Sequence, residues 1–513
     1  MLLSLKELFC ILIIATAIFR LSKSIALLFM TAEDFSRRRN VWFALTITAF
    51  LSPSFWLFVA VAVPVLAIAG KRDSNPIALY LLLLHVIPPM GVPVPMVGMP
   101  YLFIINNYLL LSFCVLTPAA LRLIRSKEDK RIRWLQTMDY CLLAYGALTA
   151  VLFVHYERPD GGLYPATFTD CVRRGFVFFF SIFVPYFSIS RASGNRRAIL
   201  DNLASFCLSC GLMAAVAIFE GAKHWLLYAD MAGRWDIPIG ISYYLMRGES
   251  LRSIASAGHS LGLGDLLVVA FGVWLYLQTH VKSKVQRVAV TLLLWSGLFA
   301  AYARGAWIAA VFVYFVAAAL GPRAYSRVLK SAFVGLFAAL IVSLTPLGAR
   351  VARVLPFFGG SVDNANIVYR ERLLDRAWQI IQESPWLGDQ EALLKMQDLR
   401  QGQGIIDLVN SYIQVLLDNG FLGLTLFLAF FLIPLFKAWK ATREAQRVDR
   451  DFSLLGASIV SCMLGTLLFI ENGSFSGGAE RVFYVLAAIA AAYSYLWRSQ
   501  QRRDLVGVQR AAE

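Results

Sequence analysis

The chain has 513 residues, of which 58% are hydrophobic and only 16% are charged, and its formal net charge is +16. Soluble domains carry about 25% charged residues, so this composition excludes an ordinary soluble protein. Apolar runs long enough to cross a bilayer core, which takes about 20 residues, recur from end to end. The sequence therefore predicts an all-α polytopic membrane protein with about 12–14 transmembrane helices.

The basic excess fits the connections between helices, because cytoplasmic loops of membrane proteins collect lysine and arginine. No nucleic-acid partner is expected from it. The seven cysteines lie in or beside apolar runs. Cys207 and Cys210 form a C-x-x-C pair within an apolar helix, and this context favours packed side chains over a metal or redox site.

The first 70 residues leave the topology open. Arg20 and Lys23 interrupt the apolar run at the N-terminus, and the triplet Arg37–Arg39 precedes a second run, 41–69, that contains Pro53. A run of this length fits either one tilted, kinked helix or a short hairpin. The arginine triplet is the one position where the number of spans and the charge rule conflict.

From Lys71 onward the apolar segments are 77–99, 102–121, 138–155, 168–189, 203–219, 260–279, 288–302, 304–320, 331–346, 410–436, 454–470 and 482–497. Strongly basic connections occur at 122–133, 191–197, 282–287, 323–330, 437–450 and 498–510. The positive-inside rule places all six connections in the cytoplasm, with an even number of spans between them. Any chemistry is then expected on the opposite face, which collects residues 156–167, 220–259, 302–305, 347–409 and 471–481.

Several arginines fall on this opposite face, against the insertion bias: Arg173, Arg174, Arg252, Arg304, Arg370 and Arg372. A guanidinium makes permanent, bidentate contacts to phosphate oxygens. The set therefore fits a pyrophosphate head group on a lipid. For any single arginine, snorkelling to lipid phosphates or pairing with loop acids explains its position equally well.

The long polar loop contains an amphipathic helix at 366–383, which Pro385 ends. Its predicted apolar stripe consists of Leu373, Leu374, Ala377, Trp378 and Ile381. We expect this helix to lie on the outer leaflet, either as one wall of a binding site or as a structural lid without substrate contact.

Two further stretches carry polar groups into spans. Residues 408–424 begin an apolar helix with the polar triplet at 410–412 and interrupt it at Asn419-Gly420. Asp265 lies just inside another span, and an intramembrane carboxylate is a functional candidate by default. Gly262 and Gly264, beside it, fit close helix packing.

Three of these stretches together resemble the O-antigen ligase/polymerase superfamily of bacterial envelope glycosyltransferases. Residues 302–307, Tyr-Ala-Arg-Gly-Ala-Trp, are similar to the family's Ser-Arg-Gly-Ala turn. Residues 369–388 look like its loop helix ending in Pro-x-x-Gly, and residues 409–424 resemble its His-Asn-x-x-Leu helix with Gly-x-x-Gly. The resemblance covers residues 250–490.

The resemblance implies a GT-C-like multi-spanning transferase in the bacterial inner membrane, with its active site facing the periplasm. Such an enzyme would move a glycan from an undecaprenyl-diphosphate carrier to an acceptor hydroxyl in exopolysaccharide or O-antigen synthesis. The resemblance implies no metal, nucleotide sugar or other cofactor. Membrane lipids and other polysaccharide assembly proteins are the further partners that fit it.

The resemblance also assigns residues. Arg304 and Arg372, or Arg370 in its place, would bind the diphosphate, with Arg252 joining them. They would stabilise the charge that develops on the leaving group. Asn410 and Tyr412 would position the acceptor or the loop.

One departure concerns the general base. The family carries a histidine immediately before the motif asparagine, whereas this chain has Val409. A general base must reach the attacking hydroxyl. Asp407, His259 and Asp389 lie on the correct face, and Asp407 is favoured among them.

We expect three parts: N-terminal transmembrane helices at 1–249, an O-antigen ligase-like core at 250–497 with its periplasmic loop 347–409, and a basic cytoplasmic tail at 498–513. A polymerase is slightly favoured over a ligase because of the Val-Asn-Ser-Tyr variant. Two other classes stay open: a transporter or flippase, which would show repeat symmetry and broken helices at mid-depth, and a non-catalytic subunit of a synthesis complex. The sequence does not give the sugars, the acceptor or the oligomeric state.

Overall fold

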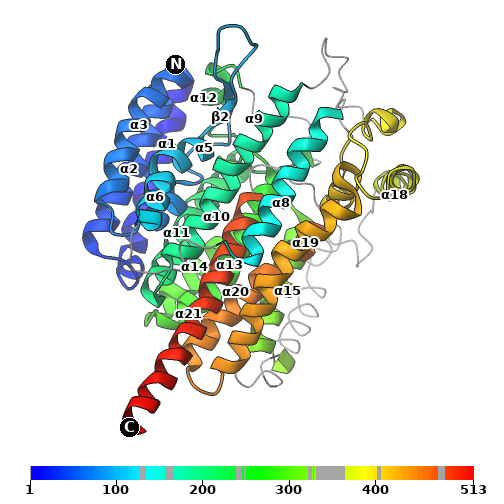
Figure 1. The fold of residues 1–513 in the computed structure, drawn as a ribbon. Coiled ribbons are helices and arrows are strands. Elements are labelled where there is room, and N and C mark those ends of the chain that lie inside the picture. Colours follow the sequence, from blue (N-terminus) through cyan, green and yellow to red (C-terminus); the bar gives the residue numbers. More distant parts are fainter. Residues whose placement is uncertain are drawn as a thin grey trace, which may run out of the picture.

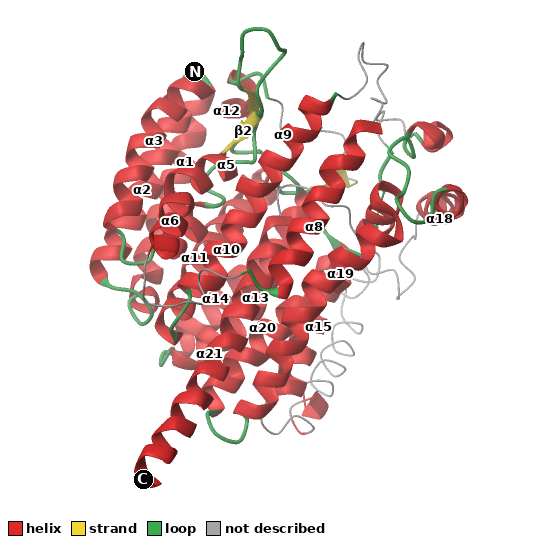
Figure 2. Cartoon of the chain, viewed as in Figure 1, coloured by secondary structure: helices red, strands yellow, loops and turns green. Residues whose placement is uncertain are grey.

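The structure is a computed structural model. It describes residues 2–125, 135–155, 167–237, 245–247, 250–321, 326, 328–330, 364–400, 406–408, 410–471 and 480–512. Within them the chain is almost entirely helical, as Figure 2 shows. Its strands there form two short antiparallel pairs, β1 (Gly91–Pro93) with β2 (Ile104–Asn106) and β3 (Met246–Arg247) with β4 (Ser250–Leu251). The predicted all-α fold is confirmed.

The first half of the chain forms α1 (Leu2–Ala26), α2 (Ala32–Leu51), α3 (Phe55–Arg72), α4 (Pro76–Leu83), α5 (Asn107–Leu111), α6 (Thr117–Arg125), α8 (Thr137–Leu152), α9 (Phe168–Phe178), α10 (Val184–Ala192), α11 (Arg196–Lys223) and α12 (Ala229–Arg234). Single π-helical turns, η1 (Ser112–Leu116) and η3 (Phe179–Phe183), join α5 to α6 and α9 to α10. Each pair therefore forms one long helix.

The second half forms α13 (Ser260–Leu277), α14 (Lys284–Ala300), α15 (Arg304–Leu320), α18 (Asn364–Glu383), α19 (Ser411–Ala445), α20 (Arg450–Phe469) and α21 (Glu480–Ala512). Short 3-10 turns are η2 (Phe153–His155), η4 (Ala255–Ala257), η5 (Gln278–His280) and η7 (Leu394–Leu399).

Eight helical segments within the described residues are long and apolar enough to cross a membrane: Ser4–Ala26, Phe55–Arg72, Asn107–Arg125, Phe168–Ala192, Arg196–Lys223, Ser260–His280, Ser411–Ala445 and Arg450–Phe469. α8 and α15 are shorter apolar helices. The chain is therefore a multi-pass α-helical membrane protein. The expected total of about 12–14 spans is larger than this number, and the predicted segment 331–346 lies outside the described residues.

The apolar run 41–69 forms two helices rather than one. α2 ends at Leu51 and α3 begins at Phe55, with Pro53 between them. Proline has no backbone N–H and its ring clashes with the preceding turn, so a helix stops before it. The hairpin interpretation of this segment is therefore the right one.

Several predicted basic connections meet at one end of the bundle, which we call the basic end. Arg196, at the start of α11, pairs with Asp449 between α19 and α20 at 3.1 Å. Gln446, in the same connection, donates to the carbonyl of Leu320 at the end of α15 at 2.6 Å. Figure 1 shows the C-terminal end of α21 at this end and the N-terminus at the other. The common location agrees with the topology expected from charge.

Arg38 resolves the conflict at the arginine triplet. Its guanidinium donates to Asp73 at 3.0 and 2.7 Å and to Asp201 at 2.6 and 3.0 Å, and all three side chains are buried. This ion cluster ties the start of α2 to the end of α3 and the start of α11. The triplet therefore lies at the basic end, and α1 runs toward that end.

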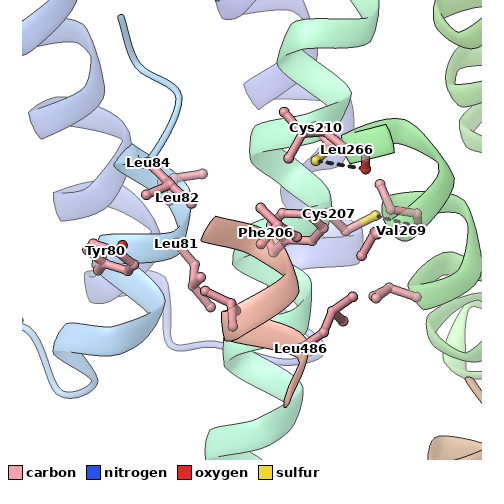
Figure 3. Packing of buried hydrophobic residues seen from close by; sticks show 14 of the residues in the cluster. Tyr80, Leu81, Leu82, Leu84, Phe206, Cys207, Cys210, Leu266, Val269 and Leu486 are labelled. Atoms are coloured by element: carbon pink, nitrogen blue, oxygen red, sulfur yellow. Dashed lines mark hydrogen bonds between the residues drawn. The ribbon is translucent and has the colours of Figure 1, made fainter. Parts of the chain in front are cut away.

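The bundle centre is apolar, and Figure 3 shows side chains of α4, α11, α13 and α21 that belong to it. The two cysteines of the C-x-x-C pair lie on α11 against α13. Cys210 Sγ is 3.7 Å from the carbonyl of Leu266, and Cys207 Sγ is 4.0 Å from that of Ala270. Both thiols are free and buried, so they serve here as small packed side chains.

Candidate functional site

The Asn419-Gly420 interruption is a break in α19 that receives another part of the chain. Gly420 has φ +61° and ψ −166°, outside the helical region. The turn that follows α18 docks there: Phe421 N–H donates to Pro385 O at 2.8 Å, and Leu422 N–H donates to Trp386 O at 3.2 Å. The turn therefore takes up hydrogen-bonding groups that the break frees.

Gly388 completes this contact from the other side. Asp389 N–H donates to Leu417 O at 2.6 Å. Gly388 has φ +76°, and a Cβ placed on it would lie 2.4 Å from Leu417 O. Only glycine allows two backbones to approach so closely at this φ. The turn 385–388 and the break 417–422 therefore form one unit, which we call the α18–α19 joint.

α18 is held against α19 and η7 by a small separate core. Leu373, Ala377, Ile380 and Ile381 are buried and belong to this core, which also includes Leu417. Figure 1 shows α18 beside the first turns of α19, with its axis crosswise to the bundle.

The predicted apolar stripe of α18 is only partly right. Leu373, Ala377 and Ile381 are buried, but Leu374 is 53% exposed and Trp378 is 51% exposed. Ile380, which the pattern missed, is buried instead. The reason is that η7, rather than a flat membrane surface, covers the helix and selects which side is buried. Leu374 and Trp378 remain available to a membrane interface.

Tyr369 links α18 to the start of α19. Its hydroxyl accepts from Asp407 N–H at 3.1 Å and donates to the Asp407 carbonyl at 3.3 Å. Asp407 is half-buried. Asn410 is the N-cap of α19, and its Oδ1 accepts from the N–H groups of Tyr412 at 2.9 Å and Ile413 at 3.2 Å. An N-cap asparagine satisfies amides that have no partner within the helix.

The start of α19 is also fixed to the end of α20. Tyr412 OH donates to Leu467 O at 2.8 Å, and Ser411 N–H donates to Ile470 O at 3.0 Å. The polar triplet at 410–412 is thus engaged in capping and anchoring. This arrangement favours a positioning role for Asn410 and Tyr412 over direct contact with an acceptor.

Arg304 is the first residue of α15 and lies at the end of the bundle where α20 ends. α15 runs antiparallel to α20, with Gly465 packed on Val313. From this contact α20 runs on to Phe469 and α15 runs back to Arg304, so Arg304 lies at the same end of the bundle as Ile470. Its side chain is exposed, and it forms no hydrogen bond or ion pair with the described part of the chain.

Arg370 and Arg372 lie on different sides of α18. Each residue of an α-helix adds about 100°, so positions two apart point about 160° away from each other. In projection Arg370 falls between Ala377 and Ile381, on the side that packs against α19 and η7. Arg372 falls on the exposed side. Both side chains are exposed and form no ion pair with described residues, but only Arg370 shares the inward face.

The segment 252–259 lies against the hairpin tip between α14 and α15. Ser253 N–H donates to Ala300 O at 3.0 Å, four residues before Arg304, and Ser253 Oγ donates to Ala217 O at 2.7 Å. Arg252 is only 3% exposed, and its positive charge acts on His259. The structure therefore brings Arg252 and His259 together, with the Arg252 guanidinium inside the protein.

Glu220, which the sequence interpretation missed, anchors this segment. It is fully buried at the end of α11. Its carboxylate accepts from the N–H groups of Leu227 at 3.1 Å, Ile254 at 3.1 Å and Ala255 at 2.8 Å. Ala255 has φ +44°, which is rare outside glycine. The signal in the sequence is a single acid immediately after the apolar run 203–219.

Glu220→Gln is expected to lower the free energy of unfolding by about 2 kcal/mol, because both side-chain oxygens accept from buried N–H groups and the amide replaces one of these oxygens by an NH2 donor. Thermal unfolding in detergent measures this. Glu33→Gln, at an exposed acid of α2, is the control and should change little. Equal midpoints for the two variants would contradict the anchoring role.

His259 is the N-cap of α13. Its Nδ1 accepts from Leu261 N–H at 3.2 Å, so the ring proton of the neutral form lies on Nε2. Burial, together with the positive charge of Arg252, lowers the pKa of His259 to about 4. A general base would accept a proton on the lone pair of Nδ1, but this lone pair already accepts the hydrogen bond from Leu261 N–H. This favours a structural role for His259.

The low pKa of His259 predicts a pH dependence of stability. The unfolded chain binds a proton at the ordinary pKa of 6.5, whereas the folded chain binds it only near 4. The free energy of unfolding should therefore fall as pH drops from 6.5 to 4, and this slope should be smaller in His259→Asn, which keeps an N-cap but does not titrate. Melting temperatures across this range test it; an unchanged slope in the variant would contradict it.

Two other predicted candidates are occupied elsewhere. Arg173 pairs with Asp170 at 2.5 Å and donates to Leu102 O at 2.8 Å, which holds the segment between β1 and β2. Asp389 pairs with Lys395 at 2.7 Å and accepts from Glu391 N–H at 2.8 Å. Both carboxylate oxygens of Asp389 therefore have partners within the described residues.

Asp265 is fully buried in α13, and neither carboxyl oxygen has a hydrogen-bond partner among the described residues. Val409 and all of residues 347–363 of the loop lie outside those residues. Within the described ranges there is no group of three or more His, Cys, Asp and Glu side chains placed to hold a metal ion.

Comparison with protein-family models finds a match in the second half of the chain. A family model described as O-antigen ligase matches residues 289–428. This stretch contains Arg304, α18, the joint and Asp407, but neither Arg252 nor His259. No curated protein matches the chain. The match to the family model supports the chain's membership of the O-antigen ligase/polymerase superfamily.

Proposed function

We propose that the protein is an inner-membrane glycosyltransferase that moves a glycan from an undecaprenyl-diphosphate carrier to an acceptor hydroxyl in exopolysaccharide or O-antigen synthesis. The observation that carries this proposal is the pair Arg304 and Arg370, which are exposed and have no ion-pair partner among the described residues. Both belong to the stretch that matches the family model. With the basic end in the cytoplasm, the site faces the periplasm.

The proposed reaction is a displacement at the anomeric carbon of the donor sugar. The acceptor oxygen forms a bond to this carbon, the bond from carbon to the phosphate oxygen breaks, and its electron pair stays on the diphosphate. Guanidinium groups at the diphosphate stabilise the charge that develops there. They supply the positive charge that the step needs, so the proposal includes no metal or cofactor.

The acceptor proton requires a base, and we assign Asp407 to this role. Its main chain is held by Tyr369 of α18, which couples its position to that of Arg370 on the next residue. Asn410 and Tyr412 position the start of α19 around it. The acceptor atoms of His259 and Asp389 are engaged in capping and in an ion pair, and neither residue is tied to α18 through Tyr369.

We further propose the division into residues 1–249, 250–497 and 498–513, and a polymerase in preference to a ligase. The variant Val409 in place of the family histidine supports the second point. Arg252 contributes to the diphosphate site indirectly, from its buried position beside His259.

The test is glycan transfer by the purified protein in a bilayer that contains an undecaprenyl-diphosphate-linked oligosaccharide. Longer glycans on the carrier are expected from a polymerase, and transfer to a second lipid would identify a ligase. No transfer under conditions where a related enzyme is active would contradict the proposal. A transporter or a non-catalytic subunit would then be the better description.

A further inference from the structure

A cleft of about 350 Å³ opens at the basic end, between the turn that follows α1 and the start of α11. The apolar residues 27–30 form one wall. Arg196, Arg197 and Leu200 of α11 form the other. Cavities of this size accommodate small ligands. Nothing in the proposed transfer reaction uses this end of the molecule.

The cleft lies at the expected membrane surface. One candidate span ends at Ala26, directly before the apolar wall, and another begins at Arg196. Leu27 is 38% exposed and Leu28 is 53% exposed. The apolar side of the cleft therefore continues the lipid-facing surface, while its arginines lie where head groups begin.

The two arginines differ in their partners. Arg196 is paired with Asp449 at 3.1 Å and also contacts Asp451. Arg197 is exposed and has no ion-pair partner among the described residues. Asp201, one turn further along α11, is held by Arg38 at 2.6 Å. The charge of Arg197 is thus left unmatched at the mouth of an apolar cleft.

We propose that this cleft binds one anionic phospholipid of the cytoplasmic leaflet, with the phosphate at Arg197 and an acyl chain along Leu28 and Leu200. Basic pockets between helices on the cytoplasmic side of a membrane suit anionic head groups. Arginine provides a fork that matches phosphate oxygens. A free phosphate would leave the apolar wall unused. This proposal does not depend on the transfer reaction.

The experiment is native mass spectrometry of the purified full-length protein in neutral detergent, titrated with dioleoyl-phosphatidylglycerol or dioleoyl-phosphatidylcholine. The wild type should retain one phosphatidylglycerol in preference to phosphatidylcholine. Arg197→Ala should weaken this binding by about fivefold or more, because one cationic contact at the membrane surface is lost. Leu28→Trp, which narrows the cleft without a charge change, should also weaken it.

Arg447→Ala is the matched control, since Arg447 is an exposed arginine at the basic end outside the cleft. It should bind phosphatidylglycerol as the wild type does. Equal affinities for Arg197→Ala and Arg447→Ala would overturn the proposal. Equal retention of the two lipids would also overturn it, as would displacement of phosphatidylglycerol by millimolar inorganic phosphate.

Discussion

Arg304→Ala and Arg370→Ala are each expected to slow glycan transfer by about 10²–10³-fold, the usual effect of removing one group that stabilises developing negative charge. Both arginines are exposed and have no ion-pair partner among the described residues, so their charge is available to the leaving diphosphate. Because Arg370 shares the inward face of α18 with Ala377 and Ile381, we expect it to be the arginine of this helix that meets the diphosphate.

Arg372→Ala is the matched control on the same helix. Its position on the outward face predicts a loss of less than about fivefold, as for a surface charge that acts only at a distance. Initial rates with the lipid-linked oligosaccharide, at saturating acceptor, measure all three variants. Arg370→Lys should recover only part of the rate, because lysine keeps the charge but lacks the fork.

Two outcomes would count against this assignment. Equal losses in Arg370→Ala and Arg372→Ala would mean that the helical face of α18 does not decide which arginine meets the diphosphate. Full activity in both Arg304→Ala and Arg370→Ala, in a preparation whose wild type is active, would exclude diphosphate binding by this pair.

Much of the fold followed from the sequence because hydrophobic runs and basic connections are strong local signals. The predicted segment 304–320 has the bounds of α15, and the predicted segment 410–436 lies within α19 apart from its first residue. The sequence did not decide whether the run around Pro53 forms one kinked helix or a hairpin, since its length fits either. The arginine triplet was resolved only by the partners of Arg38 on α3 and α11.

The site was harder to predict because its parts are joined by tertiary contacts. The sequence motifs lie within the stretch that matches the family model, but they did not indicate that Pro-x-x-Gly and Asn-Gly-x-x-Gly pack on each other. The face of α18 was misjudged at Leu374 and Trp378 because η7 determines which side is buried. Glu220 has no signature beyond its place at the end of an apolar run, and its role depends on main-chain amides more than thirty residues away.

Gly388→Ala is expected to destabilise the protein by about 3 kcal/mol or more, since it combines a strained φ with overpacking. A Cβ on Gly388 would lie 2.4 Å from Leu417 O, 2.6 Å from Asn419 N and 2.7 Å from Gly420 N. All three atoms belong to the main chain of the joint, so they cannot move aside without opening it. Because the joint holds α18, glycan transfer should be lost together with stability.

Gly98→Ala separates the two causes. Gly98 has φ +84°, close to that of Gly388, but a Cβ there would meet no atom within 4 Å. This variant should therefore show only the cost of the left-handed backbone, about 1 kcal/mol. Thermal unfolding and limited proteolysis of the α18 region compare the two. A joint built on close backbone contact requires the larger effect at Gly388; equal effects would mean that backbone strain alone explains this glycine.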